Sequence, residues 1–385
     1  MNKSKANFSD ILKRLEENKK KKLAIKIPEW SDREGITLPD TLPLEQCSSS
    51  WTADCKAALL RRALPNHTRL VDLTGGFGVD SWAFSKVFDN VLYFEMNPDL
   101  FKVSVNNFAT LQSNNIKAIN ATVDANLIDG LQHVDCIYAD PARRNEDGHK
   151  VFLIEDCKPD ILGLIESIEK VSDYLLVKFS PMADLSMLKN RLSKACTNFS
   201  VLSMGIIGIK HEVKEILVLM GEKSVILPEL FIADASLNSE DIVEVIHCEH
   251  SVCRCLKEKK YLIEPDALLM KTRCFDMICK SSIGAQRVGV NTILYVSDNP
   301  IDNALSPYCK SFLIKDIFKW NKQSIKEIGK RFPRAEVSVK GLPISSEVLA
   351  EKIGCKSGVA DDGCHYHIFA CETIEGKAII VGQHL

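Results

Sequence analysis

The sequence lacks several features that would place the protein in a special class. Its 385 residues contain no apolar run long enough to span a bilayer, which excludes a membrane-spanning helix. The first 22 residues carry charges throughout and have no apolar core, which argues against a signal peptide. The formal net charge is only −2, so the chain as a whole does not attract nucleic acid. We expect a cytoplasmic protein without membrane contact.

The cysteine pattern does not indicate a disulfide scaffold or a zinc module. Fourteen cysteines are too few, for a chain of this length, to form the framework of a small secreted domain. Cys253-x-Cys255, Cys274-x4-Cys279 and His365-x-His367 lack the paired C-x2-C spacing of zinc-binding modules. We interpret most cysteines as small buried apolar residues in a reducing compartment. The sequence therefore predicts no metal site.

A helical region is predicted for residues 1–66. Apolar residues between Phe8 and Leu15 recur at i, i+3, i+4 and i+7, the stripe of an amphipathic helix. The lysines at 19–22 form either its solvated end or a patch that faces RNA. The stretch SSSWTADCKAALLRRAL begins with capping serines and has Trp51, Cys55, Ala58 and Leu59 on one side, which predicts a second helix.

Residues 67–222 alternate between short apolar runs and amphipathic stretches. TRLVDL, NVLYFE, IKAIN, VDCIYAD and DYLLVKF are typical of strands, and the segments between them have helical spacing. This alternation predicts an α/β fold with a parallel sheet covered on both faces. Two further strands, NFSVLSMGI and EILVLMG, follow each other through a short loop and must be antiparallel. We expect a mostly parallel sheet that ends in an antiparallel hairpin.

The remaining chain mixes short strands and helices, as in small α+β domains. Residues 310–356 contain eleven basic and five acidic residues, a net charge of +6, and residues 1–26 carry the same net charge. Such segregation favours a protein that docks a polyanion on one side. In the first of these segments, the helical spacing of Lys326, Lys330 and Arg331 allows them to follow one run of phosphates. The interleaved aromatic residues either stack on bases or form a core, and we favour the core; they are Phe312, Phe318, Trp320 and Phe332.

A glycine-rich loop follows the first strand. Asp72, Gly76 and Gly78 fit the pattern D-x-x-x-G-x-G and open a helix, and Thr74 and Gly75 lie inside the loop. Glycines let the backbone approach a ligand closely, and a helix N-terminus offers free N–H groups. The sequence therefore predicts a ligand site at this loop.

Acidic residues follow the other strands of the predicted sheet. Glu95 ends the second strand, where a carboxylate can accept hydrogen bonds from ribose hydroxyls. Asp124 follows the third strand and either binds an adenine amino group or caps the next helix. Carboxylates at successive strand ends on one edge of the sheet would cradle an adenosine. Asp72 would repel a pyrophosphate and suits a cationic ligand, which favours S-adenosylmethionine over NAD.

These motifs, with the Asp140-Pro141 pair after the fourth strand, resemble the class I S-adenosylmethionine-dependent methyltransferases. A closer resemblance is to a bacterial family that adds ferredoxin-like and THUMP-like domains behind the catalytic domain. It runs from about Leu44 to the C-terminus through LEQCSSSWTADCKA, DLTGGFGVDSWAFS, DPARRNEDGHKVFLIEDCKPD, VKFSPMADL, HEVKEILVL and YLIEPDA. The sequence departs from the family in VKGLPIS, which lacks an arginine-bearing turn, and at Cys309-Lys310, where Gly-Arg is usual.

The resemblance implies a domain order and a set of cofactor contacts. It places a Rossmann-like methyltransferase sheet at 67–222, a connecting and ferredoxin-like region at 223–308, and a THUMP-like α+β domain at 309–385. S-adenosyl-L-methionine is the expected cofactor. Its expected contacts are Asp72, Thr74, Gly75, Gly76, Gly78, Glu95, Asp124 and Asp140.

The DPARR motif explains how an amino nitrogen could be methylated. Asp140 and the carbonyl of Pro141 can each accept one N–H of a base, which would aim the nitrogen lone pair at the methyl group. Arg143 can stack on the base or, with Arg144, hold a phosphate; alternatively both arginines pair with Glu146 and Asp147.

The end of the fifth strand bears on the type of reaction. Lys178 lies there, beside the DPARR motif, and neither DPARR nor KFSP contains a cysteine nucleophile. Covalent methylation of a base carbon, which uses such a cysteine, is therefore disfavoured.

We predict from these features an S-adenosylmethionine-dependent methyltransferase that modifies a base nitrogen in structured ribosomal or transfer RNA. Asp140, Pro141, Arg143 and Lys178 are the predicted catalytic residues, and Arg144 and the basic helix residues Lys326, Lys330 and Arg331 are predicted RNA contacts. The alternatives are a methyltransferase of proteins or small molecules, and a binding protein that has lost catalysis. No obligate protein partner is evident.

Overall fold

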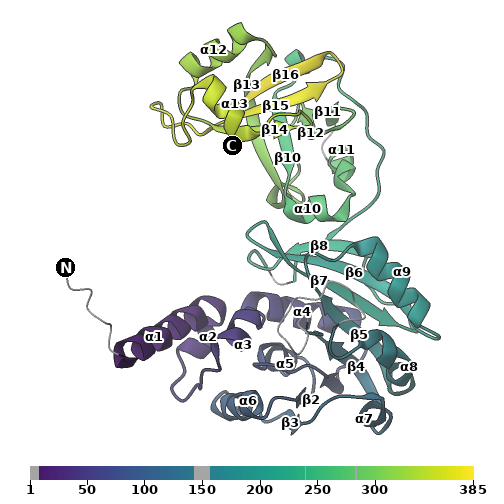
Figure 1. The fold of residues 1–385 in the computed structure, drawn as a ribbon. Helices are drawn as coiled ribbons and strands as arrows, with labels where there is room; N and C mark the ends of the chain where they lie inside the picture. Colours follow the sequence, from purple (N-terminus) through teal and green to yellow (C-terminus); the bar gives the residue numbers. More distant parts are fainter. Residues whose placement is uncertain (1–7, 143–156, 239, 282–283) are drawn as a thin grey trace. The chain divides into compact units, whose positions relative to one another are not determined.

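The computed structural model describes residues 8–142, 157–238, 240–281 and 284–385. The chain forms two compact units, Met1–Glu244 and Val245–Leu385, which are described separately (Figure 1). Within the described residues, the helices are too short or too polar to cross a membrane.

The first unit is built on a nine-stranded sheet with the order β3-β2-β1-β4-β5-β7-β6-β8-β9. Its strands are β1 (Arg69–Asp72), β2 (Asn90–Glu95), β3 (Ile116–Asn120), β4 (Val134–Ala139), β5 (Ser172–Phe179), β6 (Ser200–Ile209), β7 (Glu212–Gly221), β8 (Leu230–Asp234) and β9 (Val243–Glu244). Strands β1 to β5 are mutually parallel, and β7 is antiparallel to both β5 and β6. The predicted α/β sheet with a terminal hairpin is confirmed, and β8 and β9 extend it beyond residue 222.

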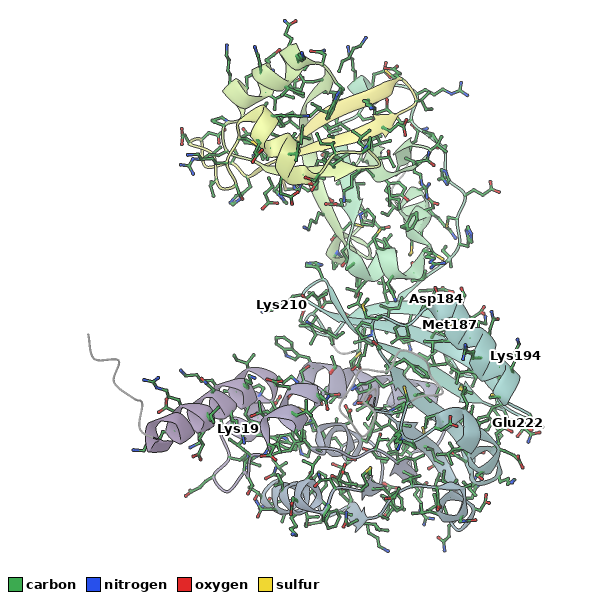
Figure 2. All side chains as sticks on the ribbon, in the orientation of Figure 1. Lys19, Asp184, Met187, Lys194, Lys210 and Glu222 are labelled. Atoms are coloured by element: carbon green, nitrogen blue, oxygen red, sulfur yellow. The ribbon has the colours of Figure 1, made fainter. Side chains whose placement is uncertain are left out.

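Helices cover both faces of this sheet. The helices after β1 are α5 (Val79–Phe84), α6 (Pro98–Thr110), α7 (Ala125–Asp129), α8 (Ile161–Val171) and α9 (Leu185–Ala195). Helices α7, α8 and α9 pack on the face that carries Val71, Ile137 and Leu175. Side-chain capping fixes where some of them begin: Asp184 accepts a hydrogen bond from the Met187 N–H at the start of α9 (Figure 2).

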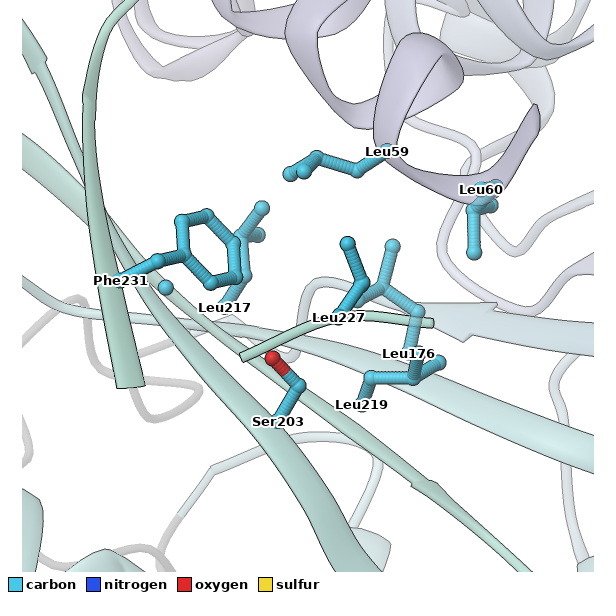
Figure 3. Close-up of a pocket in the computed structure, with 9 residues that line it drawn as sticks. Leu59, Leu60, Leu176, Ser203, Leu217, Leu219, Leu227 and Phe231 are labelled. Atoms are coloured by element: carbon cyan, nitrogen blue, oxygen red, sulfur yellow. The ribbon is translucent and has the colours of Figure 1, made fainter. Parts of the chain in front are cut away.

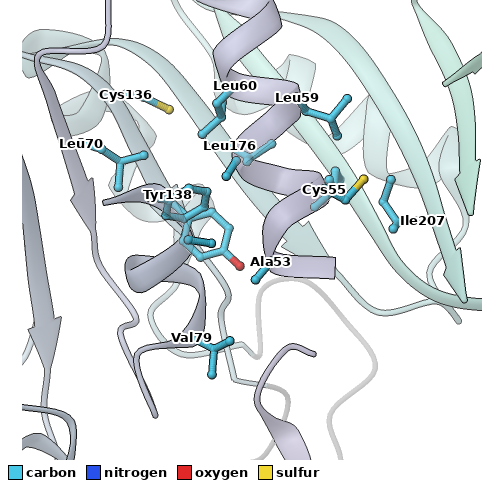
Figure 4. Packing of buried hydrophobic residues seen from close by; sticks show 14 of the residues in the cluster. Ala53, Cys55, Leu59, Leu60, Leu70, Val79, Cys136, Tyr138, Leu176 and Ile207 are labelled. Carbon is cyan, nitrogen blue, oxygen red and sulfur yellow. The ribbon is translucent and has the colours of Figure 1, made fainter. Parts of the chain in front are cut away.

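The opposite face of the sheet is covered by the N-terminal helices α1 (Phe8–Lys26), α2 (Pro28–Ser31), α3 (Thr41–Gln46) and α4 (Ser50–Ala63), together with α5. Leu59 and Leu60 of α4 pack in one cluster with Leu176 of β5 (Figure 4). Trp51 of α4 is 44% exposed, while Lys56 of the same helix is fully buried.

A cavity of about 10 Å³ lies between α4 and strands β5 to β8 (Figure 3). It is lined by Leu59, Leu60, Leu176, Ser203, Gly205, Leu217, Leu219, Leu227 and Phe231. A space of this size holds at most one water molecule, and an apolar lining offers that molecule few partners. The cavity is therefore a packing defect and not a ligand site.

The second unit contains one seven-stranded sheet with the order β11-β12-β10-β13-β16-β15-β14. Its strands are β10 (Tyr261–Pro265), β11 (Gln286–Gly289), β12 (Thr292–Ser297), β13 (Cys309–Lys319), β14 (Glu336–Lys340), β15 (Tyr366–Thr373) and β16 (Gly376–His384). Helices α10 (Ala267–Thr272), α11 (Ile278–Ser281), α12 (Lys322–Arg331) and α13 (Ser346–Ile353) connect them, with short 3-10 turns at Leu256–Glu258, Phe275–Met277 and Ser306–Tyr308. Strand β10 pairs with β13, so one sheet takes strands from both sides of residue 308. The ferredoxin-like and THUMP-like assignments stay predictions.

Candidate active site

The predicted site residues of the first unit meet at the carboxyl edge of the parallel strands. Asp72 ends β1, Glu95 ends β2, and Asp140 directly follows β4. The Asp140 N–H donates to Thr74 Oγ1 at 2.7 Å, and the Thr74 N–H donates to Asp72 Oδ1 at 3.0 Å. Thr74 therefore ties the loop after β1 to the start of the motif after β4.

The glycine loop is anchored to the end of β2. The Gly76 N–H donates to Glu95 Oε2 at 2.9 Å, and the Asn97 N–H donates to Glu95 Oε1 at 2.7 Å. The Gly76 carbonyl accepts hydrogen bonds from the Tyr93 hydroxyl at 2.5 Å and the Ser104 hydroxyl at 2.9 Å. These contacts fix both the loop and the Glu95 carboxylate before any ligand arrives.

The glycines of the loop are required for different reasons. A Cβ at Gly75 would lie 2.0 Å from the Tyr93 ring, and one at Gly78 would lie 2.5 Å from the Phe108 ring. Internal packing thus excludes a side chain at both positions, and Gly78 also has a left-handed φ of +85°. Gly76 has a φ of +57°, and a Cβ there would meet only the Thr74 carbonyl at 3.7 Å. Among the loop glycines, Gly76 best fits the predicted close approach of a ligand to the backbone.

Asp72 is almost completely buried at the head of the loop, with an exposed fraction of 1%. Burial raises the pKa of its carboxyl to about 7, although hydrogen bonds from the Ser81 hydroxyl and the Thr74 N–H lower it. Desolvation of this kind disfavours the charged form. A cationic group bound beside Asp72 would favour ionisation and would in turn be held by the carboxylate.

Lys178 of β5 pairs with Asp140, with 2.5 Å between Nζ and Oδ2. Burial alone would lower the pKa of Lys178, but the carboxylates of Asp140, Glu215 and Asp80 together raise it above its usual value. Lys178 is therefore a cation at neutral pH. It can orient and neutralise Asp140, but it cannot act as a general base.

A buried charge network, which the sequence patterns do not predict, lies near the pair of Lys178 and Asp140. Lys56 Nζ lies 2.6 Å from Glu215 Oε1 and 3.2 Å from Asp80 Oδ1. Ser48 Oγ accepts a hydrogen bond from Lys56 and donates one to Asp80 Oδ2, which also accepts from the Tyr138 hydroxyl. Side chains alternate along a strand, so Glu215 projects to the same face as Leu217, under the N-terminal helices.

The two carboxyls of this network differ in their titration. Burial raises the pKa of Glu215, although Lys56 and Lys178 oppose the shift. For Asp80, burial also acts to raise the pKa, but Lys56, Lys178 and the hydroxyls of Ser48 and Tyr138 lower it below its usual value. Lys56 has apolar residues at i−3, i+3 and i+4, namely Ala53, Leu59 and Leu60, and a lysine surrounded in this way on a predicted helix was the signal that could have revealed the network.

Comparison with solved structures shows which fold carries this site. A protein from Porphyromonas gingivalis W83, described as a "putative methyltransferase", matches with a TM-score of 0.76 and 24% identity over 96% of this chain and 89% of its own. The two proteins share one fold. A "putative RNA methyltransferase" from Pyrococcus horikoshii gives a TM-score of 0.35, with 15% identity over 53% of this chain and 98% of its own. No protein-family model and no curated protein matches the chain.

The similarity to the Porphyromonas protein spans the sheet, the glycine loop and the second unit, because it covers nearly the whole chain. At this level of identity it shows the fold alone. The assignment of chemistry therefore rests on the side chains at the carboxyl edge of the sheet.

The remaining predicted residues of the first unit have different outcomes. Asp124 is exposed and caps α7, where its Oδ1 accepts from the Leu127 N–H at 2.8 Å, so the capping alternative is confirmed. Pro141 is buried beside Asp140. Arg143 and Arg144 lie outside the described residues.

The basic residues predicted to contact RNA lie on α12 of the second unit. Lys326 and Lys330 are exposed. Arg331 is engaged within its own unit, since its Nη1 lies 2.6 Å from Asp316 Oδ2 and 3.4 Å from Glu327 Oε1. The core interpretation holds for three of the interleaved aromatic residues, which are buried: Phe312, Phe318 and Phe332.

Proposed function

We propose that this protein is an S-adenosylmethionine-dependent methyltransferase that modifies a base nitrogen in structured RNA, either ribosomal or transfer RNA. The observation that carries the proposal is the joint placement of Asp72, Glu95 and Asp140 at the ends of β1, β2 and β4, around an anchored glycine loop. The fold shared with a protein described as a "putative methyltransferase" supports it.

The residues around the loop fit S-adenosylmethionine better than a dinucleotide. A carboxylate has about four acceptor positions, so Glu95 can bind ribose hydroxyls while it holds the N–H groups of Gly76 and Asn97. Buried Asp72 suits the ammonium group of the methionine part and would repel a pyrophosphate. The bound cofactor would supply a methyl group on a cationic sulfur.

Asp140 and Pro141 would position the acceptor. Because Lys178 holds Asp140 Oδ2, the other oxygen of this carboxylate remains to accept an N–H from the base. The Pro141 carbonyl would accept the second N–H, and the two contacts would orient the nitrogen lone pair. Orientation of reacting groups contributes up to about 7–11 kcal/mol to the lowering of a barrier.

Cofactor binding can be tested at Glu95. Glu95→Ala should weaken binding of S-adenosylhomocysteine by roughly 10–100-fold, because hydrogen bonds to a charged group contribute about 1.5–3 kcal/mol. Isothermal titration calorimetry of the full chain measures the change. Asp99→Ala, which removes an exposed carboxylate in the next helix, should bind like the wild type. Binding of NAD in place of S-adenosylhomocysteine would refute the cofactor assignment.

The choice of RNA as substrate rests on the basic segment 310–356 with its net charge of +6. Each phosphate that a lysine neutralises contributes about 0.7–0.9 to the slope of log K against log salt concentration. The double variant Lys326→Ala, Lys330→Ala should therefore bind total tRNA or rRNA more weakly and reduce this slope by about 1–2. Fluorescence anisotropy over a salt series gives both quantities.

A matched control separates specific contacts from a general loss of charge. Lys257 and Lys377 are exposed lysines of the same unit outside α12, and replacing both by alanine removes the same charge. RNA binding that is equal in the two double variants would contradict a role for α12. Absence of RNA binding by the wild type would favour a protein or small molecule as the methyl acceptor.

A further inference from the structure

A group of potential metal ligands lies on the sheet of the second unit. Glu336, His367 and His384 each offer one ligand atom, and these atoms all lie within 4.8 Å of one another. In the part of the chain that the structure describes, no other group of three or more His, Cys, Asp or Glu residues meets this criterion. The group is separate from the residues proposed for methyl transfer.

Strand register explains why these three residues meet. Glu336 of β14 is the parallel partner of His367 of β15. The His384 N–H of β16 donates to the carbonyl of His365 at 2.9 Å, so His384 lies beside His365 on the neighbouring strand. Because residues two apart on a strand share a face, His365 and His367 point to the same side of the sheet. Three adjacent strands thus each supply one ligand to one face.

The His367 ring is buried and held in a fixed orientation. It is 4% exposed and stacks on Phe369 with 4.0 Å between ring centroids and 10° between planes. Its Nε2 lies 2.8 Å from Ser338 Oγ, so one of the two ring nitrogens is engaged in a hydrogen bond. In protein metal sites, a hydrogen bond of this kind on one ring nitrogen orients the other toward the metal.

The second nitrogen of His367 has no hydrogen-bond partner. Nδ1 is buried and lies 3.4 Å from Glu336 Oε2, which is longer than the 2.7–3.2 Å of an ordinary N–H···O bond. Buried polar atoms are almost always paired. In the tautomer that donates from Nε2 to Ser338 Oγ, Nδ1 is an acceptor that faces a carboxylate oxygen and a second imidazole, and a cation would complete this arrangement.

We propose that Glu336, His367 and His384 bind a divalent transition-metal cation, and that Zn²⁺ fits the donor set best. Zinc accepts imidazole nitrogen at about 2.0–2.1 Å and carboxylate oxygen at about 2.0–2.2 Å, so tetrahedral ligand atoms are roughly 3.3 Å apart. The separation of 3.4 Å between His367 Nδ1 and Glu336 Oε2 matches this value. Rotation of the half-buried His384 side chain would bring in the third ligand.

Neighbouring positive charges set a limit on the affinity. Lys310 and Lys340 lie within electrostatic reach of His367. Lys340 is paired with Glu264, and Lys310 is exposed to solvent, which screens its charge. Three protein ligands leave the fourth position of a tetrahedral zinc ion to water. The site is thus expected to bind more weakly than a four-ligand structural zinc site.

The test is metal binding by the full-length protein after treatment with a chelator. Co²⁺ titration should show one equivalent with the visible absorption of a tetrahedral site, and Zn²⁺ should displace it. Because the chain has fourteen cysteines, the spectrum must also lack thiolate-to-cobalt charge-transfer bands. Glu336→Gln and His384→Ala should each weaken binding more than tenfold, since loss of a contact outside the ligand sphere already costs about 10–100-fold.

Matched variants give the control. His133→Ala removes an exposed histidine of the first unit, and Glu347→Gln removes a carboxylate of the second unit outside the group. Both should bind Co²⁺ like the wild type. Because Glu336 is exposed and His384 is half-buried, their variants should keep the wild-type circular dichroism spectrum. Equal binding by all four variants, thiolate bands alone, or no binding would overturn the proposal.

Discussion

Asp140→Ala is expected to lower the rate of methyl transfer at least about a hundredfold, because displacement of a reacting group by about 1 Å is enough for a loss of this size. The variant removes the proposed acceptor for one N–H of the base, while the proposed cofactor contacts at Asp72 and Glu95 remain. Affinity for S-adenosylhomocysteine should therefore stay near the wild-type value. Single-turnover methylation of RNA measures the rate, and calorimetry measures the affinity.

Two control variants separate the role of Asp140 as a hydrogen-bond acceptor from the role of its negative charge. Asp140→Asn keeps the shape of the side chain but loses the charge that pairs with Lys178. Lys178→Met leaves the carboxylate in place and removes its partner. If Asp140 acts mainly by accepting an N–H of the base, both variants should retain more activity than Asp140→Ala, since each keeps an acceptor oxygen at this position. A parallel loss of rate and cofactor affinity in Asp140→Ala would instead assign this residue to the scaffold of the cofactor site.

Lys56→Met is expected to lower the free energy of unfolding of the first unit by about 3–5 kcal/mol, the usual cost of removing one partner from a buried ion pair. Lys56 is fully buried, and its ammonium group neutralises both Glu215 and Asp80. Methionine fills a similar volume but leaves two carboxylates without this cation. Urea denaturation followed by tryptophan fluorescence measures the effect, since Trp30 is buried in this unit.

The control is Lys102→Met, which breaks an exposed pair with Asp99 on α6. Exposed pairs contribute about 0–1 kcal/mol, so this variant should unfold close to the wild type. Adding Glu215→Gln and Asp80→Asn to Lys56→Met should restore part of the lost stability, because no unpaired charge then remains buried. Equal stability of Lys56→Met and Lys102→Met would show that the network contributes little.

The positions of Asp72 and Glu95 in the candidate site could be predicted from the sequence because both residues end strands. An apolar run that stops at Asp72 or Glu95 marks the end of a parallel strand, and such ends share one edge of the sheet. The hairpin of β6 and β7 was predictable for a similar reason, since two strands joined by a short loop must be antiparallel. In each case, local patterns determine the position.

The charge network and the histidine group could not be predicted in this way. Helical periodicity predicts α4 but not the burial of Lys56, because its partner Glu215 lies 159 residues later in the chain and no local pattern connects the two. Likewise, His365-x-His367 contains one ligand of the proposed metal site, while Glu336 and His384 come from other strands. Pairings between distant segments depend on strand order and register, and the spacing of residues within one segment does not predict either.

The distance in sequence between Lys56 and Glu215 also affects how the chain can fold during translation. Helix α4 leaves the ribosome early, yet the glutamate that neutralises its buried lysine belongs to β7, near the end of the first sheet. Contacts between such distant segments form late and slow the folding of a domain. Until β7 has emerged, Asp80 of α5 is the one carboxylate of the network available to Lys56, and the pair with Glu215 is missing beneath the N-terminal helices. The first unit therefore cannot complete this charge network before almost its whole length has been translated.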